Sequence, residues 1–81
     1  MSEADKMLLK EGYKLKYEDE YEIKYEYHSR ELGDSFYFIL CFCKKAKIYF
    51  HKDIDCNSIG VNIGLHKAIN KKCFELGWLD E

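Results

Sequence analysis

The sequence predicts an α+β fold, a four-stranded antiparallel meander with a short N-terminal helix and a C-terminal helix packed on one face. The first observation is the stretch of residues 35–43, in which eight of nine residues are apolar or aromatic and none is charged. A strand that is apolar on both faces lies inside a sheet and is covered above and below. The second is that residues 13–17 and 21–28 alternate apolar and charged side chains, as strands with one wet face do. The third is the helical spacing of apolar residues from position 65 onward.

We expect residues 1–81 to form one domain, because a chain of this length fits a single core. A domain this small buries only about 60–65% of the surface of its unfolded chain. However, 47% of the residues are hydrophobic and 16% are aromatic, so the core is richer than the length suggests. The net charge of −2 predicts no class of partner. Residues 1–35 carry ten acids and six bases and residues 36–81 five acids and seven bases, an asymmetry too mild to indicate nucleic-acid binding.

We expect the protein to work in a reducing cytoplasm. The N-terminal residues have no apolar stretch of the kind that a secretory signal needs. The four cysteines are then expected to be free thiols. The longest apolar stretch is also much shorter than the roughly 20 residues of a membrane-spanning helix, so we expect no membrane partner.

A short helix is expected over residues 3–11. Ser2 can cap its first turn, and Asp5, three residues on, supplies the acidic partner of a capping box. Gly12 stands where a glycine commonly ends a helix, since glycine adopts the left-handed conformation without steric cost.

Four strands are expected next, at residues 13–17, 21–28, 35–43 and 48–51. The short links between them make successive strands antiparallel neighbours. Strand side chains alternate between faces, so the first strand should point its lysines to water and three residues inward: Tyr13, Leu15 and Tyr17. The third should place Phe36, Phe38, Leu40 and Phe42 on one face and Tyr37, Ile39, Cys41 and Cys43 on the other.

Five tyrosines are predicted to share one face of the sheet: Tyr13, Tyr17, Tyr21, Tyr25 and Tyr27. As core residues they would bury their rings and reach solvent with the hydroxyl. As an exposed stripe they would form a partner surface, because tyrosine is enriched at interfaces. Both interpretations remain open from the sequence.

The C-terminal part of the chain is expected to form the second helix. Ile59, Val61 and Ile63 could form a short fifth strand, but we prefer Asn62 as the cap of the helix. One face of this helix is predicted to be apolar: Leu65, Ala68, Ile69, Lys72, Cys73 and Leu76. Gly77 should end the helix, and Trp78 can fold back as the hydrophobic partner of a Schellman motif.

The ending from Ala68 to Trp78 (AINKKCFELGW) resembles that of small uncharacterised phage and prophage proteins of Gram-positive bacteria. These share an AI-x-K-x-x-x-ELGW tail behind a hairpin rich in Tyr, Lys and Glu. The resemblance covers the tail closely and the hairpins loosely, and it implies an origin in a mobile element. It carries no catalytic residue to this chain. Phe74 departs from expectation, because it lies opposite the apolar helix face, where we expect a polar residue.

We expect no enzyme and no cofactor. The cysteines Cys41, Cys43, Cys56 and Cys73 could in principle make an all-thiolate zinc site, but the usual zinc-knuckle spacing is absent and buried inert thiols are the simpler interpretation. The histidines His28, His51 and His66 have no spacing typical of a metal site or a nucleophile pair. The lysines follow no phosphate-binding loop or RNA-binding aromatic motif, so we do not expect nucleic acid as a partner.

Binding to a host protein or to a second copy of the chain is the predicted function. Two short helices can cover only one face of the sheet, so the apolar band of the third strand needs a cover on the other face: a long side chain, the loop 53–62, a twin subunit or a foreign protein. The predicted contact residues are Glu18, Asp19, Glu20, Glu22, Glu26, Tyr37 and Phe74.

The resemblance implies a more specific role, inhibition of a host defence nuclease in the manner of an anti-CRISPR protein, with the acidic hairpin as a mimic of nucleic acid. The alternatives are a homodimeric structural or scaffolding phage protein and a small zinc- or nucleic-acid-binding module. A solvated turn and a solvated strand face would also account for the acidic residues.

Overall fold

The computed structural model describes residues 2–28 and 37–79 of the chain. Its elements are α1 (Glu3–Lys10), β1 (Lys14–Glu18), β2 (Glu22–His28), β3 (Tyr37–Cys43), β4 (Ile48–Asp53) and α2 (Ile63–Glu75). The four strands form one antiparallel sheet in the order β1-β2-β3-β4. The predicted α+β meander is therefore confirmed, while the predicted positions 35 and 36 of the third strand lie outside the described residues.

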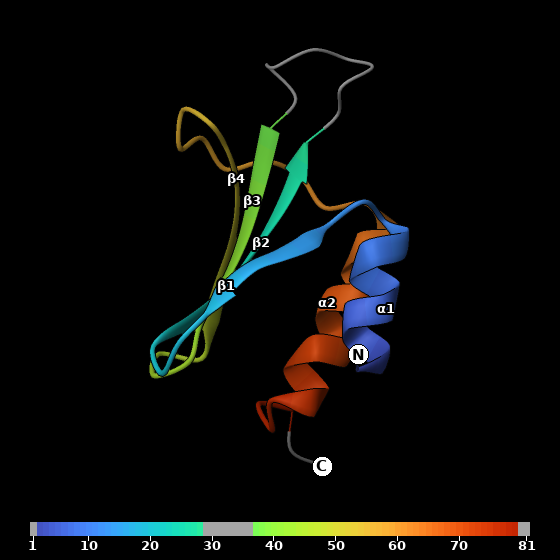
Figure 1. The fold of residues 1–81 in the computed structure, drawn as a ribbon, viewed down its shortest axis with the longest axis vertical. Coiled ribbons are helices and arrows are strands. Elements are labelled where there is room, and N and C mark those ends of the chain that lie inside the picture. The colour runs from blue at the N-terminus through green and yellow to red at the C-terminus, as the bar shows by residue number, and fades with distance from the viewer. Residues whose placement is uncertain (1, 29–36, 80–81) are drawn as a thin grey trace.

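Both helices lie on the same side of the sheet (Figure 1). α1 and α2 lie side by side there, and between them and the sheet is the core. The buried core residues are Leu8, Tyr13, Ile23, Tyr25, Leu40, Phe42, Leu65, Ala68, Ile69 and Cys73. No described helix covers the opposite side of the sheet, which we call the open face.

The ends of both helices follow the local signals of the sequence. The Ser2 hydroxyl accepts a hydrogen bond from the backbone N–H of Asp5 at 3.1 Å, and the Asn62 side chain accepts one from the N–H of Leu65 at 2.8 Å. Residues 59–62 belong to no strand, and Asn62 is the cap of α2. The prediction that Asn62 caps the helix is therefore confirmed, and a fifth strand through Ile59, Val61 and Ile63 is not formed. At the other end of α2, the N–H of Trp78 donates to the carbonyl of Cys73, which is the long hydrogen bond of a Schellman motif.

The first strand departs from its prediction. Tyr13 is buried, but the register of β1 on β2 shifts between Leu15 and Tyr17, with Leu15 opposite Tyr25 and Tyr17 opposite Lys24. Such a bulge inserts one extra residue, so the side chains beyond it change faces. The prediction that Tyr17 points inward with Leu15 is therefore wrong, because Tyr17 lies on the open face.

The predicted tyrosine face is divided, because the bulge moves Tyr17 and because Tyr21 precedes the start of β2. Tyr13, Tyr25 and Tyr27 lie on the helix side, where Tyr27 stacks on Phe38 with ring centroids 5.5 Å apart. Tyr21 is exposed at the end of the hairpin, with the Lys45 ammonium 5.2 Å from its ring centroid. The tyrosines are thus core residues at some positions and surface residues at others.

β3 is the interior strand that the sequence predicts. Leu40 and Phe42 point to the helices and are fully buried. Cys41 points to the open face and is nevertheless buried, because side chains from β2 and β4 flank it on both sides.

Candidate functional site

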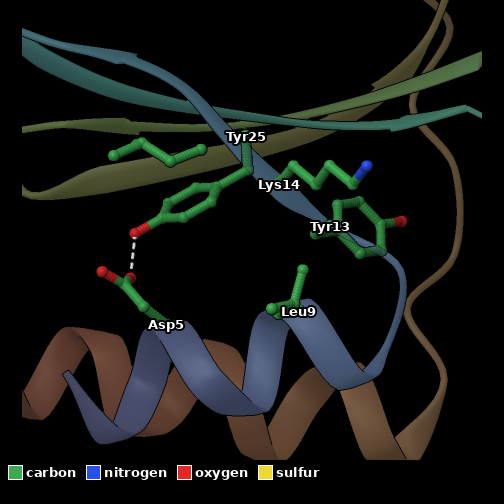
Figure 2. Close-up of a pocket in the computed structure, with 6 residues that line it drawn as sticks. Asp5, Leu9, Tyr13, Lys14 and Tyr25 are labelled. Atoms are coloured by element: carbon green, nitrogen blue, oxygen red, sulfur yellow. Dashed lines mark hydrogen bonds between the residues drawn. The ribbon is translucent and has the colours of Figure 1, made fainter. Parts of the chain in front are cut away.

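A groove of about 390 Å³ opens between α1 and the β1–β2 hairpin (Figure 2). The residues that line it are Asp5, Leu9, Tyr13, Lys14, Leu15 and Tyr25. Leu9 and Leu15 remain 44% and 51% exposed. The walls of the groove are therefore mainly apolar and open to solvent.

Asp5 closes one end of this groove. The Tyr25 hydroxyl donates to Asp5 Oδ1 at 2.5 Å, and Lys72 Nζ lies 3.2 Å from the same oxygen. Lys72 is only 8% exposed, with its ammonium 5.9 Å from the Tyr25 ring centroid. Burial, together with the hydrogen bond to the carboxylate, raises the pKa of Tyr25 and keeps its hydroxyl a donor. Because the carboxylate is already paired, the groove suits an apolar group better than it suits acid–base chemistry.

A second polar contact joins Tyr13 to β4. The Tyr13 hydroxyl lies 2.5 Å from His51 Nε2, and His51 Nδ1 lies 3.0 Å from the carbonyl of Gly60. A carbonyl only accepts hydrogen bonds, so Nδ1 carries the proton and Nε2 accepts from Tyr13. Burial lowers the pKa of His51 and raises the pKa of Tyr13 to about 12. These two contacts of His51 link β4 to Tyr13 on one side and to the segment before α2 on the other, so their role is structural.

The β1–β2 half of the open face carries a network of ion pairs and tyrosines. Lys16 Nζ lies 3.6 Å from Glu26 Oε2, and the Tyr37 hydroxyl donates to the same oxygen at 2.7 Å. Lys24 Nζ lies 3.6 Å from Glu22 Oε1. We call these residues, together with Tyr37 at the start of β3, the charged ladder: Lys16, Tyr17, Glu22, Lys24, Glu26 and Tyr37.

The β3–β4 half of the open face is apolar. Its members, which we call the apolar strip, are Ile39, Cys41 and Cys43 on β3 and Ile48 and Phe50 on β4. On one side Cys41 contacts the ladder, since its Sγ lies 3.7 Å from Glu22 Oε2. On the β4 side, Ile48 and Phe50 remain 45% and 47% exposed. The long side chains of the ladder therefore cover part of the apolar band and leave its outer part open.

The predicted contact residues are divided among three places. Glu22, Glu26 and Tyr37 come together in the charged ladder. Phe74, by contrast, lies on α2, 53% exposed, with the Lys71 ammonium 5.7 Å from its ring centroid.

The other three predicted acids lie at the end of the β1–β2 hairpin. Glu18 pairs with Lys44 at 3.0 Å. Asp19 accepts hydrogen bonds from the backbone N–H groups of Tyr21 and Glu22, which lower its pKa. Glu20 is exposed. Glu18, Glu22 and Glu26 are thus paired with lysines, and Asp19 is held by backbone N–H groups.

Sequence reasoning missed the groove and the exposed residues of β4. Ile48 and Phe50 lie opposite Cys43 and Cys41, so they extend the apolar band onto an edge strand. The predicted strand 48–51 already implied that Ile48 and Phe50 share a face, because side chains alternate between the two faces of a strand. No local signal marks the groove, because its walls come from α1 and the hairpin.

Within residues 2–28 and 37–79, no three His, Cys, Asp or Glu side chains gather as metal ligands would. Cys41 and Cys73 are buried and Cys56 is exposed, and desolvation raises the pKa of Cys41 to about 11. None of the helices in this part of the chain has the length and apolar character needed to cross a bilayer.

No protein-family model matches this sequence, and neither curated proteins nor solved structures give a significant match. The resemblance of the C-terminal tail to phage proteins therefore stays a prediction. The geometry of the surfaces is what remains to indicate a function.

Proposed function

We propose that this protein is a small non-enzymatic binding protein that acts by protein–protein contact through the apolar strip of its open face. The observation that carries the proposal is the half-exposed pair Ile48 and Phe50, which continues the partly buried apolar surface of β3. Exposed apolar patches bordered by polar groups mark interaction sites in proteins that are otherwise well packed.

The two halves of the open face fit the usual composition of an interface. An interface has an apolar centre from which charged residues are depleted, and a polar rim. The apolar strip supplies such a centre, and the charged ladder lies beside it with its ammonium and carboxylate groups already paired. Covering the apolar strip contributes roughly 25 cal/mol per Å² of apolar surface removed from water.

The specific role that we propose is inhibition of a host defence nuclease by a phage or mobile-element protein in the cytoplasm of a bacterial host cell, as anti-CRISPR proteins do. Support for this target class comes from the resemblance of the tail and from the acidic hairpin end. Because Glu18 and Asp19 are already engaged, the contact depends mainly on the apolar strip and only secondarily on acidic mimicry.

Homodimerisation through the same face is the second candidate. The charged ladder contains both signs of charge, with Lys16 and Lys24 next to Glu22 and Glu26. A twofold axis can therefore place the lysines of one copy against the glutamates of the other while the apolar strips meet. This would make the protein a scaffolding component.

Phe50→Asp tests both candidates, with Phe74→Asp as the matched control. Phe74 lies on α2 outside the apolar strip, so our proposal gives up the sequence prediction that Phe74 makes contact. The two phenylalanines are similarly exposed, at 47% and 53%, but only Phe50 belongs to the apolar strip. We expect Phe50→Asp to abolish capture of a host protein from lysate or, if the protein is a dimer, to convert it to the 9.7 kDa monomer in light scattering. Phe74→Asp should preserve either behaviour. Equal capture and equal mass for wild type and Phe50→Asp, with both folded by circular dichroism, contradict the proposal.

A further inference from the structure

The two edges of the sheet are treated differently by the chain. Beyond β4, the segment 57–59 pairs with the C-terminal half of the strand, through hydrogen bonds of 3.0 Å from Ile59 N–H to the His51 carbonyl and from Asp53 N–H to the Asn57 carbonyl. β1 pairs with β2 on one side only, and all five of its residues are exposed. Within the described part of the chain, β1 is therefore the edge that remains open along its whole length.

The groove runs beside this open edge. Leu15 of β1 lies opposite Tyr25, so its side chain points to the helix side of the sheet, where Leu9 forms the facing wall. A strand added next to β1 would place every second side chain on that same side. One such side chain would then enter the groove between Leu9 and Leu15.

The charges around the groove indicate which charge a segment bound to β1 should carry. Asp5 is paired with Lys72 and Glu18 with Lys44. Lys6, Lys10 and Lys14 form no ion pair with any residue that the structure describes, and all are exposed. On α1 the lysines are offset by Glu3 and Glu11, which also form no ion pair with a described residue. On β1 itself Lys16 and Glu18 are paired and Lys14 is not, so the unpaired charge of the edge strand is positive. Opposite charges across a strand pair stabilise pairing.

We propose that β1 and the groove together bind an extended acidic segment of a partner protein. The segment pairs with β1 as a fifth strand, inserts one large apolar side chain between Leu9 and Leu15, and places carboxylates near Lys10 and Lys14. Main-chain hydrogen bonds supply affinity in this mode of recognition, and the side-chain pocket supplies specificity. The lysines and the bulge in β1 are features that discourage pairing with a second copy of the same edge. This site is separate from the apolar strip and stands independently of the function proposed for it.

A set of blocked heptapeptides tests the proposal. The peptides alternate Asp or Glu with Val and carry Leu, Phe, Met or Trp at the centre, and binding is followed by amide chemical shifts of the full-length protein. We expect at least one acidic peptide to give saturable shifts in β1 and at Leu9. Its counterpart with Lys in place of the acids should bind at least about tenfold more weakly. Methylating the backbone nitrogens of alternate residues, in one of the two possible sets, should abolish binding.

Leu15→Asp and the matched control Ile63→Asp locate the site. Both side chains are exposed, Leu15 by 51% and Ile63 by 70%, so neither change should unfold the protein. We expect Leu15→Asp to weaken peptide binding at least about tenfold, and Ile63→Asp to leave it unchanged. The proposal is overturned if no acidic peptide shifts β1 at up to about 1 mM, if both N-methylated sets still bind, or if the shifts concentrate at Ile48 and Phe50.

Discussion

Gly12 joins α1 to β1, and its replacement by alanine tests how tightly this junction packs against the core. Its φ is +96°, a conformation that L side chains rarely adopt. A Cβ atom added there would lie 2.6 Å from Cε2 and 2.7 Å from Cδ2 of Tyr27. Carbon atoms pack best at about 3.5–4.0 Å, so the Tyr27 ring must move by about 1 Å. That ring is stacked on Phe38 and also contacts Tyr13, so the movement disturbs both.

Two costs add in Gly12→Ala. The left-handed backbone costs about 1–2 kcal/mol for a residue with a Cβ, and overpacking against Tyr27 costs about 1–3 kcal/mol more. Gly77 separates them, because its φ is +77° but no atom lies within 4 Å of the added Cβ. We expect Gly12→Ala to lose about 2–5 kcal/mol of unfolding free energy and Gly77→Ala only about 1–2 kcal/mol.

Urea unfolding followed by circular dichroism measures both variants. A domain of this size has a total stability of only about 4–12 kcal/mol, so both variants are unfolded in the presence of a stabilising osmolyte. Losses that agree within about 0.5 kcal/mol for the two variants would show that the Tyr27 ring gives way freely, and would refute the packing argument.

Three further predictions concern the polar contacts. Asp5→Asn and Lys72→Met should each lower the free energy of unfolding in urea by about 2–3 kcal/mol, because each change leaves the other group without its opposite charge in a mostly buried place. The double variant should lose about 1–3 kcal/mol less than the sum of the two single losses. Strictly additive losses would argue against coupling between the two residues. Asn62→Ala should lose about 1 kcal/mol with the helix cap, whereas the exposed mid-helix change Asn70→Ala should lose nothing, and equal losses would contradict the capping role. The pKa of Tyr13 is raised to about 12, so the neutral phenol is favoured in the folded state. The stability that Tyr13 contributes should be fully present below pH 10 and should fall by about 1.4 kcal/mol per pH unit as the pH rises from 10 toward 12. Tyr13→Phe should therefore lose stability less steeply than the wild type over this range, the slope that remains coming from Tyr25, whose pKa is also raised.

Much of the fold follows from signals that lie within a few residues of one another. Ser2, Asn62 and Gly77 mark helix ends, because a cap depends only on backbone groups one turn away. The stretch 37–43 is an interior strand because it has no polar face to give to water. Short links then leave an antiparallel meander as the simple arrangement of the strands.

The candidate surfaces needed the tertiary structure. The bulge that moves Tyr17 to the open face depends on how β1 pairs with β2, and no residue type in β1 predicts it. Cys41 is buried on an open face because Glu22 crosses over from the neighbouring strand, while Phe50, in the same row, is left half exposed at the edge. Two acids that look unpaired in the sequence pair with lysines distant in the chain, Glu26 with Lys16 of β1 and Glu18 with Lys44 in the turn after β3.

The amino-acid sequence alone was enough to predict the elements, their order and the core-facing side of β2, β3 and α2, because these follow from periodicity along one segment. It was not enough for β1, where the bulge changes the face of Tyr17. The packing of the whole chain was needed to see which half of the open face stays apolar, which sheet edge stays unpaired and where the groove opens beside α1. Those properties depend on which side chains of different segments meet across space. Contacts between segments that are far apart in the chain produce no periodic pattern in the sequence.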